Sequence, residues 1–146
     1  ILDKGLIGEL VAESDFVVNL AASLGVFNIV NKPLESLITN LKGSGIVIEI
    51  ADQYKKPILI ASTSEVYGDP LVHPQTEDYW GNVNPVGPRG VYDEAKRFQE
   101  AITMAYHTFH NIETRIVRIF NTYGPRMAID DGRVVSNFIV AALTQI

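Results

Sequence analysis

The stretch Pro57-Ile58-Leu59-Ile60-Ala61-Ser62-Thr63 decides the fold class, because it is almost wholly apolar and shows little polar alternation. A strand of this kind is typical of a parallel sheet that is covered on both faces. Two more strands are predicted, at Phe16–Ala22 before it and at Thr114–Phe120 after it. Periodic apolar residues predict four helices around these strands, at Leu6–Ala12, 33–54, 91–110 and Val134–Ile146.

The alternation of strands and helices predicts an α/β fold, with a parallel sheet and helices on both of its faces. In such folds ligands bind beyond the carboxyl ends of the strands. Polar clusters follow the three strands at Asn19–Ser23, Ser62–Glu65 and Asn121–Arg126. A long loop, Gly68–Arg89, follows the second cluster, and loops of this length are often functional. We therefore expect a single cleft that collects the three clusters.

Composition excludes several classes of function. The 146 residues fit one domain, and a net charge of −5 argues against a nucleic-acid-binding surface. The absence of cysteine excludes disulfides, thiolate catalysis and cysteine-based metal sites, and the three histidines form no metal-ligand pattern. The longest apolar stretch, Phe16–Val30, is too short for a membrane span and contains polar residues. We expect a cytoplasmic protein that binds neither membrane nor metal.

Tyr92 and Lys96 are the most informative pair for chemistry. They lie four residues apart on a predicted helix, so their side chains share one face. A cation beside a tyrosine favours the phenolate and lowers the phenol pKa from its usual value of about 10. Tyr92 is therefore a candidate general base. Taken alone, such a pair more often marks a solvated helix face.

Five motifs surround this pair. They are Asn19-Leu20-Ala21-Ala22, Thr39-Asn40-Leu41-Lys42-Gly43, Ser62-Thr63-Ser64-Glu65-Val66-Tyr67-Gly68, Tyr92-x-x-x-Lys96 and Arg118-Ile119-Phe120-Asn121-Thr122-Tyr123-Gly124-Pro125-Arg126. With them the chain resembles the extended short-chain dehydrogenases/reductases, the NAD-dependent epimerase/dehydratase family. This resemblance implies a Rossmann-like sheet that binds NAD.

Within that family, residues 62–138 look most like the UDP-glucuronate decarboxylases. The discriminating stretches are 62–70, His73-Pro74-Gln75-Thr76-Glu77-Asp78-Tyr79-Trp80-Gly81, 84–97 and 130–138. Residues 1–56 support the wider family only. A nucleotide sugar, UDP-glucuronate, is therefore the expected substrate, with a 4,6-dehydratase or a 4-epimerase as the alternative activities.

The resemblance implies roles for four catalytic residues. Tyr92 would take the proton of the sugar C4 hydroxyl while NAD stores the hydride, and Lys96 would lower the Tyr92 pKa and contact the nicotinamide ribose. Thr63 would hydrogen-bond the reacting C4 oxygen. A glutamate at position 65 favours a decarboxylase or a dehydratase, because simple 4-epimerases need no carboxyl group at this position.

Further binding residues are carried over from the same motifs. The implied cofactor-binding residues are Leu20, Ala21, Ala22, Asn40, Lys42, Ser62, Tyr92 and Lys96. The implied substrate-binding residues are Ser64, Glu65, Asn121, Arg126 and Asn137. The two alanines equally suit tight packing, and exposed arginines such as Arg126 often bind nothing specific.

The sequence also departs from the family pattern. It contains no Gly-x-x-Gly-x-x-Gly motif, and Ile1 resembles the point after the third strand of the family. We expect residues 1–146 to be a partial NAD(P)-binding domain, incomplete on the N-terminal side and short of the substrate lobe. Such a chain would bind NAD weakly or not at all by itself. A non-catalytic interaction module is the alternative of another class, since the helices at 33–54 and 91–110 pair across a homodimer in the family.

Overall fold

The sheet of this protein is parallel and three-stranded. The computed structural model describes residues 1–23, 32–88, 90–129 and 132–144. The strands β1 (Val17–Asn19), β2 (Ile58–Thr63) and β3 (Thr114–Ile119) lie in the order β1-β2-β3. In the register, Ile58 pairs with Val17 on one side and with Thr114 on the other. The predicted parallel α/β sheet is therefore confirmed.

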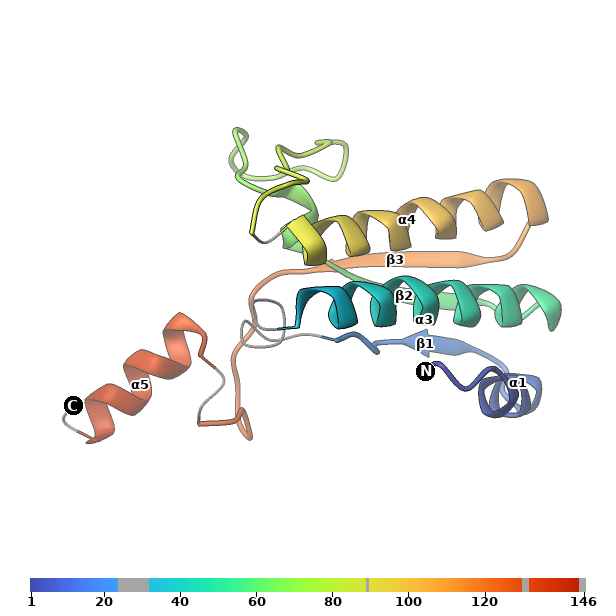
Figure 1. Ribbon diagram of the computed structural model, residues 1–146, viewed down its shortest axis with the longest axis horizontal. Coiled ribbons are helices and arrows are strands. Elements are labelled where there is room, and N and C mark those ends of the chain that lie inside the picture. The colour runs from blue at the N-terminus through green and yellow to red at the C-terminus, as the bar shows by residue number, and fades with distance from the viewer. Residues whose placement is uncertain (24–31, 89, 130–131, 145–146) are drawn as a thin grey trace.

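The four helices in the described residues match the four predicted ones. They are α1 (Lys4–Glu13), α3 (Pro33–Gln53), α4 (Gly90–His110) and α5 (Val134–Thr144), and a short 3-10 helix, η1 (Ser64–Tyr67), follows β2 directly. Helices α3 and α4 run side by side along the sheet, whereas α5 stands apart from it (Figure 1). None of the helices in these ranges combines the length and the hydropathy that a membrane crossing requires.

The core lies between the sheet and the two long helices. Ile58 and Ile60 of β2 are buried against Val47, Ile48 and Ala51 of α3. Ile112, between α4 and β3, belongs to the same buried cluster. Partly buried residues of the other elements pack against it: Ile7, Val17, Ile102, Tyr106 and Ile116. Burial of each aliphatic side chain stabilises the fold by roughly 1.5–3 kcal/mol. The core thus fixes α4, and with it Tyr92 and Lys96, over the end of β2.

Two features differ from the sequence expectation. The first strand is shorter than Phe16–Ala22, because only three residues pair with β2 and Leu20 already lies 65% exposed. Helices on both faces were expected, but α3 and α4 pack on the same face of the sheet. On the opposite face Val18, Val117 and Ile119 are exposed. Apolar alternation along a short strand does not reveal which face is covered.

Candidate active site

The carboxyl end of β2 places Thr63 and Glu65 at the predicted edge of the sheet. The strand turns into η1 at this point, where the Thr63 hydroxyl oxygen accepts a hydrogen bond from the Glu65 backbone N–H at 3.3 Å. A side-chain oxygen in this position caps the first turn of a helix. Both side chains are thereby held half-buried on one short turn.

Tyr92 lies in the first turn of α4, buried and facing this turn. Burial raises the pKa of the Tyr92 phenol, and the negative charges of Glu65 and Asp93 act in the same direction. A hydrogen bond with Thr63 and the charge of Arg133 act in the opposite direction without prevailing. The structure therefore brings Tyr92, Thr63 and Glu65 together.

The expected lowering of the Tyr92 pKa by Lys96 is wrong for this structure. The Lys96 ammonium donates to the Ala61 carbonyl oxygen at 2.7 Å and to the Gln99 side-chain oxygen at 2.9 Å. Both contacts are buried, and burial lowers the pKa of Lys96 to about 8. The shared helix face is real, but the ammonium is held by these two acceptors and is not among the causes of the Tyr92 shift.

The end of β1 is tied to α3 through Ser23. The Asn40 side chain accepts from the Ser23 N–H at 2.7 Å and donates to the Ser23 carbonyl oxygen at 3.1 Å. Ser36 donates to the same carbonyl at 3.2 Å. The Asn40 amide is thus engaged within the chain, whereas Leu20, Ala21 and Lys42 are exposed and Ala22 is half-buried.

Ser62 has a structural partner in place of a free hydroxyl. It donates to Glu100 at 2.5 Å, and Arg118 donates twice to the same carboxylate, both times at 2.9 Å. Burial pushes the pKa of Glu100 up, but the hydrogen bonds from Arg118 and Ser62 outweigh it and leave this pKa below its ordinary value. Bonds to Glu100 in turn raise the pKa of Arg118. This charge pair is therefore stable across the physiological pH range.

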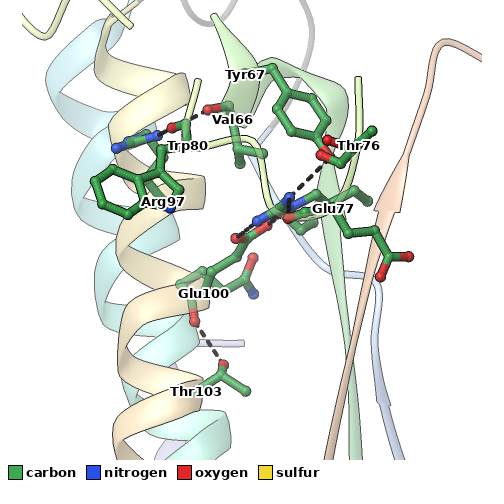
Figure 2. A network of polar contacts seen from close by, with 11 residues as sticks. Val66, Tyr67, Thr76, Glu77, Trp80, Arg97, Glu100 and Thr103 are labelled. Atoms are coloured by element: carbon green, nitrogen blue, oxygen red, sulfur yellow. Dashed lines mark hydrogen bonds and ion pairs between the residues drawn. The ribbon is translucent and has the colours of Figure 1, made fainter. Parts of the chain in front are cut away.

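The same arginine fastens the loop at 68–89 to the sheet. Arg118 donates to the Tyr67 hydroxyl and to the Glu77 carbonyl oxygen, each at 2.9 Å, and lies over the Tyr67 ring. Arg97 donates to the carbonyl oxygens of Val66 and Trp80 at 3.0 and 2.8 Å. Figure 2 shows Tyr67, Glu77 and Glu100 converging beside α4, with Arg97 and Trp80 nearer the start of the helix.

The fastened loop leaves a hollow of ≈ 500 Å³ beside the site. Its walls come from η1, the loop and the start of α4, and they include Glu65, Asp69, Asn82 and Asp93. Glu65 is thus shared between the hollow and the surroundings of Tyr92. The site is open to a polar ligand from this side.

The expected substrate residues that follow β2 and β3 differ in their exposure. Asn121, Arg126 and Asn137 are exposed, and Ser64 is half-buried. The Asn137 amide donates to the Gly132 carbonyl oxygen at 3.2 Å, a contact within its own turn. These four residues remain predictions.

Sequence reasoning gave no role to Gln99, Glu100, Arg118 or Arg133. Gln99 carried a usable signal, because it lies one turn from Lys96 on the buried face of α4. Glu100 and Arg118 are 18 residues apart, and Arg118 and Tyr67 are 51 apart. Separations of this size leave no local pattern to recognise.

Comparison with known proteins points in one direction. A family model described as "GDP-mannose 4,6 dehydratase" matches residues 1–146. The chain is 54% identical to UDP-glucuronic acid decarboxylase 6 of Arabidopsis thaliana over 134 residues, which cover 92% of this chain and 39% of that protein. It is 47% identical to UDP-glucuronic acid decarboxylase 1 of Xenopus tropicalis over 143 residues, or 98% of this chain and 34% of that protein.

A solved structure supports the same fold. The UDP-glucose 4-epimerase of Thermotoga maritima, determined with UDP-glucose, matches with a TM-score of 0.83 at 25% identity. The match covers 98% of this chain and 47% of the epimerase. The chain therefore spans less than half the length of the relatives it matches, and its sheet is Rossmann-like, as predicted.

Proposed function

The chain belongs to the GDP-mannose 4,6 dehydratase family, and from this premise we propose that residues 1–146 form part of the NAD-binding domain of a nucleotide-sugar decarboxylase. The proposed reaction converts UDP-glucuronate to UDP-xylose and CO2 through a 4-keto sugar. The observation that carries the proposal is the convergence of Tyr92, Thr63 and Glu65, in a chain 54% identical to a protein named for this reaction. A carboxyl group beside the tyrosine favours decarboxylation over simple epimerisation.

Two observations fit a dinucleotide at this edge of the sheet. The Lys96 ammonium has three N–H groups, of which Ala61 and Gln99 occupy two, so one is left for a ribose hydroxyl. The Asn19 amide nitrogen, at the end of β1, is buried without a hydrogen-bond partner among the described residues. Lys96 and Asn19 would therefore hold the cofactor. When bound, NAD would accept a hydride from the sugar and return it, and its nicotinamide charge would favour the Tyr92 phenolate.

The chain's own residues would move the protons. Tyr92 takes the proton of the C4 hydroxyl and later returns it, while the Thr63 hydroxyl holds the C4 oxygen in place. A ketone at C4 lies β to the carboxylate on C5, so loss of CO2 leaves an enolate. Glu65, which also lines the open hollow, would relay a proton from solvent water to C5 in place of the CO2 that is lost. In the present state Tyr92 is protonated at neutral pH, because burial and two carboxylates raise its pKa.

Product analysis tests this proposal. The matched segment of the Arabidopsis decarboxylase is replaced by residues 1–146, and the chimera is incubated with carboxyl-labelled UDP-glucuronate. We expect labelled CO2 and UDP-xylose in equal amounts. UDP-galacturonate without CO2 would identify an epimerase, and turnover of UDP-glucose to a 4-keto-6-deoxy sugar would identify a dehydratase. A chimera that retains bound NAD but releases no CO2 would contradict the proposal.

We also propose that the protein forms a homodimer through α3 and α4. Helix α4 carries exposed apolar side chains, among them Phe98, Met104 and Phe109. Exposed apolar area of this kind is typical of an interaction surface. In light-scattering measurements the wild-type chain should have twice its monomer mass. The Phe98→Glu variant should have the mass of a monomer. Val86→Glu is the matched control, because Val86 lies on the loop and is 93% exposed. A wild-type chain that stays monomeric at high concentration would refute the dimer.

A further inference from the structure

Gln99 is a buried amide that faces a buried ammonium. Its side chain is 2% exposed, and its oxygen accepts the hydrogen bond from Lys96 one turn earlier on α4. The reverse orientation of the amide would point N–H donors at a group that has only donors. The orientation of Gln99 is therefore set by the charge of Lys96, although its own amide nitrogen is left without a partner among the described residues.

Among the described residues, the acceptors of the Lys96 ammonium are neutral groups. Its second acceptor is the Ala61 carbonyl of β2, and burial is the cause of its lowered pKa. The Glu100 carboxylate, one turn further along the helix, is already bound by Ser62 and Arg118. No ion pair joins Lys96 to any of the described acidic residues.

The charged groups of the site act elsewhere. Glu65 of η1, Asp93 of α4 and Arg133 at the edge of α5 influence the Tyr92 phenol. The Gln99 oxygen is therefore the side-chain acceptor that compensates Lys96 for its loss of water. Loss of this acceptor would leave a buried ammonium with one hydrogen bond fewer, which favours its neutral form.

We propose that Gln99 is a positioning residue of this site, whose side-chain oxygen fixes the Lys96 ammonium against β2 and keeps it charged at neutral pH. The inference deepens the role proposed for Lys96 and rests on it for its catalytic meaning. The contact itself needs neither cofactor nor substrate.

Titration of Lys96 in the whole chain tests the proposal. Lysine labelled with ¹³C at Cε reports protonation by NMR, and Lys96→Arg assigns the signal. The wild-type midpoint should lie near 8. Gln99→Met, which keeps the shape and removes the acceptor, should lower the midpoint by about one unit or more, since hydrogen bonds to charged groups are the stronger ones. Gln99→Glu should raise it by a similar amount.

The matched control is Thr103→Val. Thr103 is fully buried one turn further along α4 and donates to the Gln99 backbone oxygen, not to the side chain. This variant should lose stability and leave the Lys96 midpoint unchanged. Equal Lys96 midpoints in the wild type and Gln99→Met would overturn the proposal. If Gln99→Met does not fold, an unchanged Lys96 midpoint in Gln99→Glu would overturn it as well. Because no turnover is measured, failure of the proposed reaction would not move either readout.

Discussion

Replacement of Arg118 by methionine should destabilise the protein far more than replacement of Arg115 on the same strand. Arg118 and Glu100 form a pair whose side chains are 26% and 15% exposed. Arg118→Met would leave the Glu100 carboxylate largely buried with Ser62 as its remaining partner. Removal of one member of a buried pair costs about 3–5 kcal/mol, and the residual exposure of this pair favours a value of about 3 kcal/mol.

Arg115 supplies the matched control. Its pair with Glu113 is 59% and 60% exposed, and such surface pairs contribute about 0–1 kcal/mol. Urea unfolding followed by circular dichroism measures both variants against the wild type. A loss below 1 kcal/mol for Arg118→Met, equal to that for Arg115→Met, would refute the reasoning. Glu100→Leu added to Arg118→Met should restore part of the loss, since an apolar pair leaves no buried charge.

Acid should weaken the same pair. The pKa of Glu100 is lowered in the folded state, so its contribution to stability is present above its unfolded pKa and is lost as the pH falls through the folded value. The free energy of unfolding should therefore fall less steeply with acid in Arg118→Met than in the wild type. Parallel acid profiles for the two proteins would contradict this assignment.

Two further predictions concern the backbone strain at Gly68 and the titration of Lys96 at high pH. Gly68 has a φ of +65°, and a Cβ there would lie 2.2 Å from the Asn82 carbonyl oxygen. Gly68→Ala should therefore lower the free energy of unfolding in urea by at least about 2 kcal/mol. Gly45→Ala, with open space on α3, should raise it by about 0.5–1 kcal/mol, and similar effects of the two substitutions would refute the strain at Gly68. The pKa of Lys96 is lowered from 10.5 to about 8, so between these pH values the folded state binds fewer protons than the unfolded state. The free energy of unfolding should therefore rise by about 2 kcal/mol from pH 8 to 10, relative to Lys96→Met. Equal slopes in both proteins would contradict a buried Lys96.

The order of strands and helices could be read from the sequence, because each element carries its own pattern. The apolar run 57–63 gave β2 to within one residue, and the periodic stretch 91–110 gave α4 equally well. The predicted first strand was too long, since Leu20 and Ala21 lie exposed beyond the last pairing with β2. Pairing partners, rather than hydrophobicity, determine where that strand ends.

The site could be predicted only in part. Motifs placed Thr63, Glu65 and Tyr92 at one strand end, and the structure brings them together. The direction of the Tyr92 pKa shift could not be predicted, because it depends on burial and on where the Lys96 ammonium points. Gln99 holds that ammonium through a contact that the spacing permits but does not require.

Tyr92 is proposed to perform the proton transfer of a decarboxylase. The most direct measurement is release of labelled CO2 from UDP-glucuronate by the chimera that carries residues 1–146, with Tyr92→Phe compared with Tyr106→Phe. Tyr106 lies on the same helix, packed on the core and against His110, away from the site. Loss of a general base should slow release by about 10²–10⁴-fold in Tyr92→Phe and leave Tyr106→Phe close to the wild-type rate. Equal rates in the two variants, with NAD bound in both, would contradict the account.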